Sequence, residues 1–277
     1  MIFDFKDKVV VITGAGGVIC GDLAKAFGKQ GAKVALLDLN LEAAQAFASE
    51  IKAAGGHAKG YRANVLDKDH LQDVHQEVNK DFGPCDILIN GAGGNNPKAT
   101  TDNEFHENDL PEETKTFFDL DPTGIEFVFN LNYLGTLLPT QVFAQDMVTK
   151  EHAAISNISS MNAFTPLTKI PAYSGAKAAI SNLTAWLAVH FAKTNIRCNA
   201  IAPGFLVTKQ NENLLFDEQH QPTPRAKKIL GNTPMGRFGK ADELTGGVFF
   251  LADHNLSSFI DGVVLPIDGG FNAYAGV

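Results

Sequence analysis

The sequence predicts an α/β fold, a single doubly wound parallel sheet of about seven strands with helices on both faces. Three observations carry this prediction. Short β-branched runs alternate with longer segments in which apolar residues recur at helical spacing. A glycine-rich turn joins the first predicted strand to the first predicted helix. Polar residues follow several of the strands, as expected for a ligand site at the carboxyl edge of a parallel sheet.

The predicted elements alternate from one end of the chain to the other. After the first strand, a helical pattern runs through Leu23 and Phe27. We expect strands at Lys8–Thr13, Lys33–Asp38, Ala58–Arg62, Cys85–Asn90, Ala153–Ile158, Ile196–Ala202 and Val263–Ile267. The other helices are expected at Leu41–Ala54, Asp67–Phe82, Ile125–Val148, Ala172–Lys193 and Ala241–Ala252. No internal repeat or low-complexity linker interrupts this pattern, so residues 1–277 are predicted to form one domain.

The first turn, Thr13–Gly21, has the composition of a phosphate-binding loop. Backbone N–H groups in such a turn, together with a helix N-terminus, can hold a pyrophosphate, although a tight turn without a ligand is the alternative. Asp38 ends the second strand 24 residues after Gly14. A carboxylate there can bind ribose hydroxyls and repel a 2′-phosphate, which favours NAD over NADP. The alternative role for Asp38 is a cap for the next helix.

Tyr173 and Lys177 are four residues apart in a predicted helix, so they share one face. A lysine cation beside a phenol favours the phenolate and lowers a pKa that is ~10 when unperturbed. Such a tyrosine can act as a general acid or base near neutral pH. Ser160 ends the preceding apolar run, and its hydroxyl could bond the same substrate oxygen. Strand ends at Thr13, Asp38, Asn90, Ser160 and Pro203 would bring these groups to one edge of the sheet.

Composition favours a cytoplasmic enzyme domain. The formal net charge of −8 argues against a nucleic-acid surface, and no run reaches the ~18 apolar residues of a membrane span. The first residues are mixed and acidic, unlike a signal peptide. Cys20, Cys85 and Cys198 are scattered, as expected for reduced core thiols. His106 with its neighbouring glutamates matches no strong ligand spacing, so no metal is predicted.

Several motifs together resemble the short-chain dehydrogenase/reductase family, with its Rossmann-type sheet. They are Thr13-Gly14, Asn90-Gly91-Ala92-Gly93, Asn132, Ser160, Tyr173-x-x-x-Lys177, Pro203-Gly204 and Asp268-Gly269-Gly270. The resemblance implies hydride transfer at a CH–OH group and a homotetramer. The catalytic residues it implies are Ser160, Tyr173 and Lys177, with Asn132 completing a proton relay through water. Around NAD it implies Gly14, Gly17, Val18, Ile19, Asp38, Asn64, Val65, Asn90, Ala92, Gly93, Tyr173, Lys177, Pro203, Gly204 and Thr208.

The chain departs from the family pattern at three places. Val18 and Cys20 stand where the turn usually has glycines, and Gly91 replaces the second Asn of the common Asn-Asn-Ala-Gly motif. Asn64 stands where an Asp often lies beside the adenine. A polar segment near residues 94–124 is longer than is usual in the family, and a substrate loop is expected near residues 203–232.

Three further stretches resemble the D-mannonate oxidoreductase (fructuronate reductase) branch of the family. They begin at Gly94, Ser159 and Ala202. This likeness implies a sugar-acid substrate, and a gluconate 5-dehydrogenase-like enzyme and a non-catalytic nucleotide-binding regulator are the alternatives. Lys169, Lys209, Gln210 and Asn211 are further amides or cations able to bind a sugar acid. The expected substrate residues are Asn95, Lys98, Ser160, Asn162, Tyr173 and Phe205.

Overall fold

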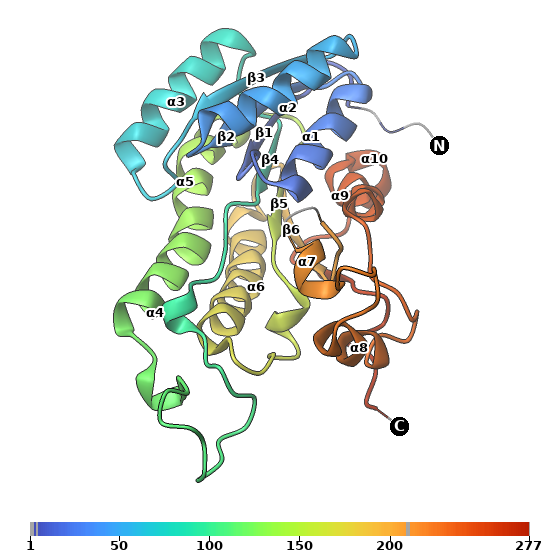
Figure 1. The fold of residues 1–277 in the computed structure, drawn as a ribbon. Helices are drawn as coiled ribbons and strands as arrows, with labels where there is room; N and C mark the ends of the chain where they lie inside the picture. Colours follow the sequence, from blue (N-terminus) through green and yellow to red (C-terminus); the bar gives the residue numbers. More distant parts are fainter. Residues whose placement is uncertain (1–2, 4, 209–210, 277) are drawn as a thin grey trace.

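A computed structural model describes residues 3, 5–208 and 211–276. Within them, seven parallel strands form one sheet in the order β3-β2-β1-β4-β5-β6-β7 (Figure 1). This confirms the predicted fold class. The strands are β1 (Val9–Thr13), β2 (Lys33–Asp38), β3 (His57–Arg62), β4 (Ile87–Asn90), β5 (Ala153–Ile158), β6 (Ile196–Pro203) and β7 (Val264–Ile267).

Helices cover both faces of the sheet, because the central strands bury their side chains on both faces. In β1, Val10 and Ile12 pack with α1 (Val18–Lys29), α2 (Leu41–Ala53) and α9 (Thr245–Ala252). Val9 and Val11 point to the opposite face. There they pack with α3 (Lys68–Asp81), α5 (Gly135–Met147) and α6 (Pro171–Phe191).

The single helix expected at Ile125–Val148 is wrong in detail. The structure has α4 (Pro122–Phe129), a π-helical turn at Asn130–Leu134, and then α5. A π turn adds one residue to a helical turn without breaking the apolar pattern, so periodicity does not reveal it. The segment expected as a helix at Ala241–Ala252 likewise begins with a 3₁₀ turn, Ala241–Leu244. Three short helices were not expected: α7 (Glu212–Leu215), α8 (Pro224–Gly231) and α10 (His254–Ser257).

The polar segment near residues 94–124 extends away from the sheet beside α4 (Figure 1). It contains two 3₁₀ turns, Pro97–Ala99 and Phe117–Asp119, and it is held mainly by backbone acceptors. Lys115 donates to the Pro97 carbonyl, and Lys169 donates to the Asp102 carbonyl, each at 2.7 Å. Among the described helices, none has the length and apolar character needed to cross a membrane.

Candidate active site

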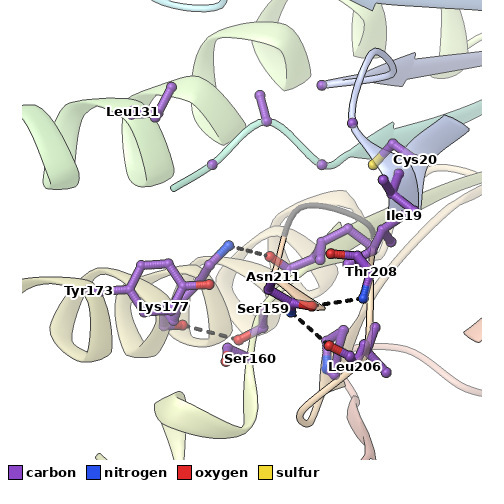
Figure 2. Close-up of a pocket in the computed structure, with 18 of the residues that line it drawn as sticks. Ile19, Cys20, Leu131, Ser159, Ser160, Tyr173, Lys177, Leu206, Thr208 and Asn211 are labelled. Carbon is purple, nitrogen blue, oxygen red and sulfur yellow. Dashed lines mark hydrogen bonds between the residues drawn. The ribbon is translucent and has the colours of Figure 1, made fainter. Parts of the chain in front are cut away.

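The strand order reverses between β1 and β4, and such a reversal leaves a crevice at the carboxyl edge of the sheet. A cavity of about 720 Å³ lies there, within the usual range for small-molecule sites. Figure 2 shows the part of it lined by α6 and by the chain that follows β6. The residues expected at the site that line this cavity are Gly14, Gly17, Val18, Ile19, Asp38, Asn64, Val65, Ala92, Gly93, Ser160, Tyr173, Lys177, Pro203, Gly204, Phe205 and Thr208.

The turn after β1 packs directly on the chain that leaves β4. Gly14 has φ +66°, and a Cβ there would lie 2.8 Å from the Ala92 backbone, so only glycine fits. The Thr13 hydroxyl accepts hydrogen bonds from the Gly91 and Ala92 N–H groups, at 3.1 and 3.3 Å. No side chain caps α1 at Gly17, so its first N–H groups are open to an anion in the cavity.

Two departures from the family pattern pack against each other in this turn. The Cys20 side chain is buried, and its Sγ occupies the place that a Cβ on Gly91 would need. The thiol therefore fills the space left by the missing side chain at position 91. Burial raises the pKa of Cys20 to about 12, so this thiol stays protonated and acts as a small apolar group.

Asp38 lies at the expected place for a ribose-binding acid. Its Oδ2 accepts from the Gly16 N–H and its Oδ1 from the Asn40 N–H, both at 2.9 Å. The cap of α2 is Asn40, which accepts from the Ala43 N–H, so the alternative role of Asp38 as the helix cap is wrong. Each oxygen of Asp38 keeps a lone pair for a hydroxyl. The glycine cradle and this carboxylate together fit a dinucleotide.

The Ser160, Tyr173 and Lys177 side chains lie together at the other end of the cavity (Figure 2). Ser160 precedes the 3₁₀ turn Met161–Ala163 and accepts from the Asn162 N–H at 3.3 Å. Tyr173 and Lys177 lie in the first turns of α6, with the ammonium nitrogen 5.6 Å from the centre of the phenol ring. Lys177 donates to the Ile158 carbonyl at 2.8 Å, which fixes it to the end of β5.

Burial dominates the titration of this pair. It raises the pKa of Tyr173, and a hydrogen bond with Ser160 opposes part of that rise. It lowers the pKa of Lys177 to about 8. The expectation that Lys177 alone lowers the tyrosine pKa is therefore not met in this structure. Desolvation destabilises the phenolate more than the ammonium, 5.6 Å from the ring centre, stabilises it. The positive charge of an oxidised nicotinamide would act in the direction that the phenolate needs.

Asn132 lies in the π-helical turn with its side chain fully buried. Its Nδ2 donates to the carbonyls of Gly94 and Val128, and its Oδ1 accepts from the Gly94 N–H. A Cβ on Gly93 would lie 2.6 Å from that Oδ1 and 3.2 Å from the Lys177 Nζ. Asn132 therefore lies behind the cavity wall, where it holds the 93–94 backbone close to Lys177. These contacts are those of a positioning residue, and the expected part of Asn132 in a proton relay stays a prediction.

Asn90 corrects one expectation about the cofactor residues. It is buried and does not line the cavity. Its Nδ2 donates to the Thr140 hydroxyl and the Asn157 Oδ1, both at 2.9 Å, and Asn157 in turn donates to Thr184. The Nδ2 group of this strand-end amide thus joins β4 to β5 and α5 instead of facing the cavity, while its buried Oδ1 has no partner among the described residues.

Three expected substrate residues also lie outside the cavity lining. Lys98 has an exposed side chain that pairs with Asp121 at 3.2 Å. Asn95 donates to the Thr100 hydroxyl at 2.9 Å, because the Asn-Asn-Pro-Lys run forms a 3₁₀ turn that closes on itself. Asn162 is buried in the 3₁₀ turn Met161–Ala163, and its Oδ1 has no hydrogen-bond partner among the described residues. The contacts of Asn95 and Lys98 contradict their expected substrate roles, whereas the role of Asn162 stays a prediction.

The other amides and cations expected to be able to bind a sugar acid differ in where the structure places them. The Lys169 ammonium is bound to the Asp102 carbonyl. Lys209 and Gln210 lie outside the described residues. Asn211 lines the cavity, but its amide bridges the Thr208 N–H and the Leu206 carbonyl, each at 2.8 Å, and so shapes the loop (Figure 2).

The sequence reasoning missed Arg225, which lines the cavity from α8. The available signal was Thr223-Pro224, a helix-start pattern inside the expected substrate loop. Eight residues are too short for periodicity to show which face a helix turns inward. The sequence reasoning also missed an apolar part of the lining, which includes Phe127, Leu131, Leu206, Leu214, Leu215 and Ile229. Over the described residues, no group of three His, Cys, Asp or Glu side chains could hold a metal.

A phosphate cradle, an acid at the ribose position and a serine–tyrosine–lysine set, joined in one cavity, define a nicotinamide-dependent oxidoreductase acting on CH–OH groups. The model of the short chain dehydrogenase family matches residues 8–219. The chain therefore belongs to that family.

Similar proteins cover nearly the whole chain. An "Uncharacterized oxidoreductase" of Haemophilus influenzae is 66% identical over 99% of this chain and 96% of its own length. A solved structure of a "putative D-Mannonate oxidoreductase from Haemophilus influenza" holds bound NAD. It has a TM-score of 0.97 and 66% identity, over 99% of this chain and 98% of that chain. Gluconate 5-dehydrogenase of Gluconobacter oxydans is 31% identical over 97% of this chain and 96% of its own length.

Proposed function

We propose that this protein is an NAD(H)-dependent oxidoreductase that interconverts D-mannonate and D-fructuronate. The observation that carries the redox chemistry is the meeting of Ser160, Tyr173 and Lys177 beside the glycine cradle in one cavity. The sugar acid is supported by the likeness to the Haemophilus structure described above. The proposal treats residues 1–277 as one catalytic unit.

Bound nicotinamide would accept or supply the hydride. The Ser160 hydroxyl holds the oxygen of the reacting carbon, and Tyr173 removes its proton during oxidation or returns it during reduction. Lys177 binds the nicotinamide ribose from its anchor on Ile158. Asn132 keeps the backbone at Gly93–Gly94 against that lysine. The apolar wall of the cavity keeps water away from the reacting atoms.

We expect NAD(H) to be preferred over NADP(H) because the Asp38 carboxylate would face the extra phosphate. Replacing Asp38 with Ser should raise kcat/KM for NADPH relative to NADH, since the repulsion is lost while a small polar group remains. Steady-state rates with both cofactors check this. Glu42→Gln in the first turn of α2 is the matched control, as it removes a nearby charge that does not line the cavity. A wild-type enzyme that favours NADPH would contradict the assignment.

The runner-up is a gluconate 5-dehydrogenase-like enzyme, which the likeness to the Gluconobacter oxydans protein supports. Oxidation of NADH in the presence of fructuronate, 5-keto-D-gluconate or uncharged ketoses separates the two. Fructuronate as the fastest substrate supports the proposal, and turnover of 5-keto-D-gluconate without fructuronate moves the assignment to the runner-up. Failure of every ketone would favour a non-catalytic nucleotide-binding regulator.

We further propose a cytoplasmic homotetramer with 222 symmetry. Cys20, Cys85 and Cys198 are free and buried, which suits a reducing compartment. On the outer face of α6, Trp186 and Val189 are 56% and 79% exposed, so the helix carries apolar surface suited to another subunit. Light scattering at micromolar concentration should give four times the mass of one chain. The mass of a single chain would contradict this prediction.

A further inference from the structure

The cavity holds few charges for a site that takes an acid. Among its described lining residues, the only lysine or arginine side chains are Lys177 and Arg225. The Lys177 ammonium is buried and donates to the Ile158 carbonyl beside Tyr173. Of the cations among these described lining residues, Arg225 is the one that remains for a ligand anion.

The packing of α8 decides which way Arg225 faces. The hydroxyl of Thr223 caps the helix by accepting from the Ala226 N–H at 3.2 Å. Ala226 and Ile229 are buried in a small core with Leu215, which fixes the rotation of α8. Ile229 lies four residues after Arg225, on the same face, and it too lines the cavity. The face of α8 that carries Arg225 is therefore the cavity face.

The position three residues after Arg225, which lies beside it on α8, is held by an ion pair. Lys228 pairs with Glu104 of the polar 94–124 segment, so that carboxylate already has a cation. Within the described residues, the exposed Arg225 side chain makes no hydrogen bond and no ion pair, although its charge adds, after that of Lys228, to the lowering of the pKa of Glu104. Its neighbours in the cavity lining include the apolar Leu214, Leu215 and Ile229. A guanidinium that lines the cavity, is exposed and has no hydrogen-bonded partner can offer its planar fork to a planar anion that enters the cavity.

We propose that Arg225 binds the carboxylate of the substrate and thereby sets the preference for sugar acids over uncharged sugars. This inference rests on the proposed function only in taking the substrate to be a sugar acid. Arg225 replaces Lys98, the cation expected at the substrate, because Lys98 is paired with Asp121 outside the cavity. A cofactor phosphate is the other anion that a guanidinium could bind, and the test separates it from a carboxylate.

The test compares Arg225→Gln with wild type on fructuronate and on its uncharged methyl ester, with NADH saturating. KM for the acid should rise about tenfold or more, as loss of a charge-assisted hydrogen bond implies, while KM for the ester stays within about twofold. Arg225→Lys should recover part of the loss, because it restores the charge without the fork. Lys227→Gln is the matched control, since it removes a neighbouring charge from an exposed position of α8 outside the cavity lining.

The outcomes separate this inference from the proposed function. Equal changes for acid and ester, or a weaker Kd for NADH by fluorescence, would remove Arg225 from carboxylate binding while leaving the reaction in place. If wild type reduces 5-keto-D-gluconate but not fructuronate, the same comparison on that acid and its methyl ester tests Arg225, and only the proposed function fails. Wild-type turnover of uncharged ketoses alone overturns both.

Discussion

Replacing Tyr173 with Phe is expected to lower kcat by about 10²-fold or more, because the substitution removes the hydroxyl that exchanges the proton. The ring keeps its packing against the small cluster that includes Ala99 and Val128, and the glycine cradle and Asp38 are untouched, so the Kd for NADH should stay close to wild type. Stopped-flow reduction of the ketone, with NADH binding followed by fluorescence, measures both quantities.

Tyr274→Phe provides the control for that experiment, since it removes the same hydroxyl from a residue near the C-terminus that does not line the cavity. Turnover by Tyr173→Phe near the wild-type rate would show that another group carries the proton. A large loss of NADH binding would instead show that the substitution disturbs the cavity, and Tyr173 would then not be assigned from the rate alone.

Replacing Lys177 with Met should abolish turnover and yet stabilise the protein at pH 7. The ammonium is buried, and its only described hydrogen bond is to the Ile158 carbonyl. An unbranched apolar side chain of similar length avoids the cost of burying that charge, although it leaves the carbonyl without its donor. We expect a net rise of about 1–2 kcal/mol in the free energy of unfolding, measured by urea denaturation.

The advantage of Lys177→Met should depend on pH. Burial lowers the pKa of Lys177 from 10.5 to about 8 in the folded chain. Between those values the unfolded chain binds the extra proton, so wild-type stability rises with pH through that interval. The mutant should therefore be most favoured below about pH 8 and lose its advantage as the pH passes 10.5. An advantage that does not change with pH would show that the lysine charge is not its source.

Most of the fold could be predicted because both faces of the sheet are buried. Strands such as β1 and β2 then read as continuous apolar runs, and the helices between them show a helical period. The π turn at Asn130–Leu134 could not be predicted, since one added residue does not break that period. The helices α7 and α8 are too short to show a period at all.

The candidate site, like the fold, could be predicted from the sequence only in part. Local geometry fixes Gly14, Asp38 and the Tyr173–Lys177 pair, and the sequence placed all of them in the cavity lining. Asn90 and Lys98 were misplaced because their partners, Thr140 and Asp121, are distant in sequence or lie in an irregular segment. Whether a polar side chain faces a ligand or the protein depends on such partners, which a single sequence does not show.

The packing of Cys20 on Gly91 has a consequence for how this loop can change by mutation. A Cβ at position 91 would overlap the Cys20 sulfur at 2.1 Å and would lie 3.0 Å from the Thr13 carbonyl oxygen, so a smaller residue at position 20 would relieve the larger of the two clashes. The two positions are therefore expected to be non-additive, with Gly91→Ala more harmful in the present chain than after Cys20→Gly. The order of the two changes matters, because a chain that changes position 91 first passes through the more damaged cofactor loop.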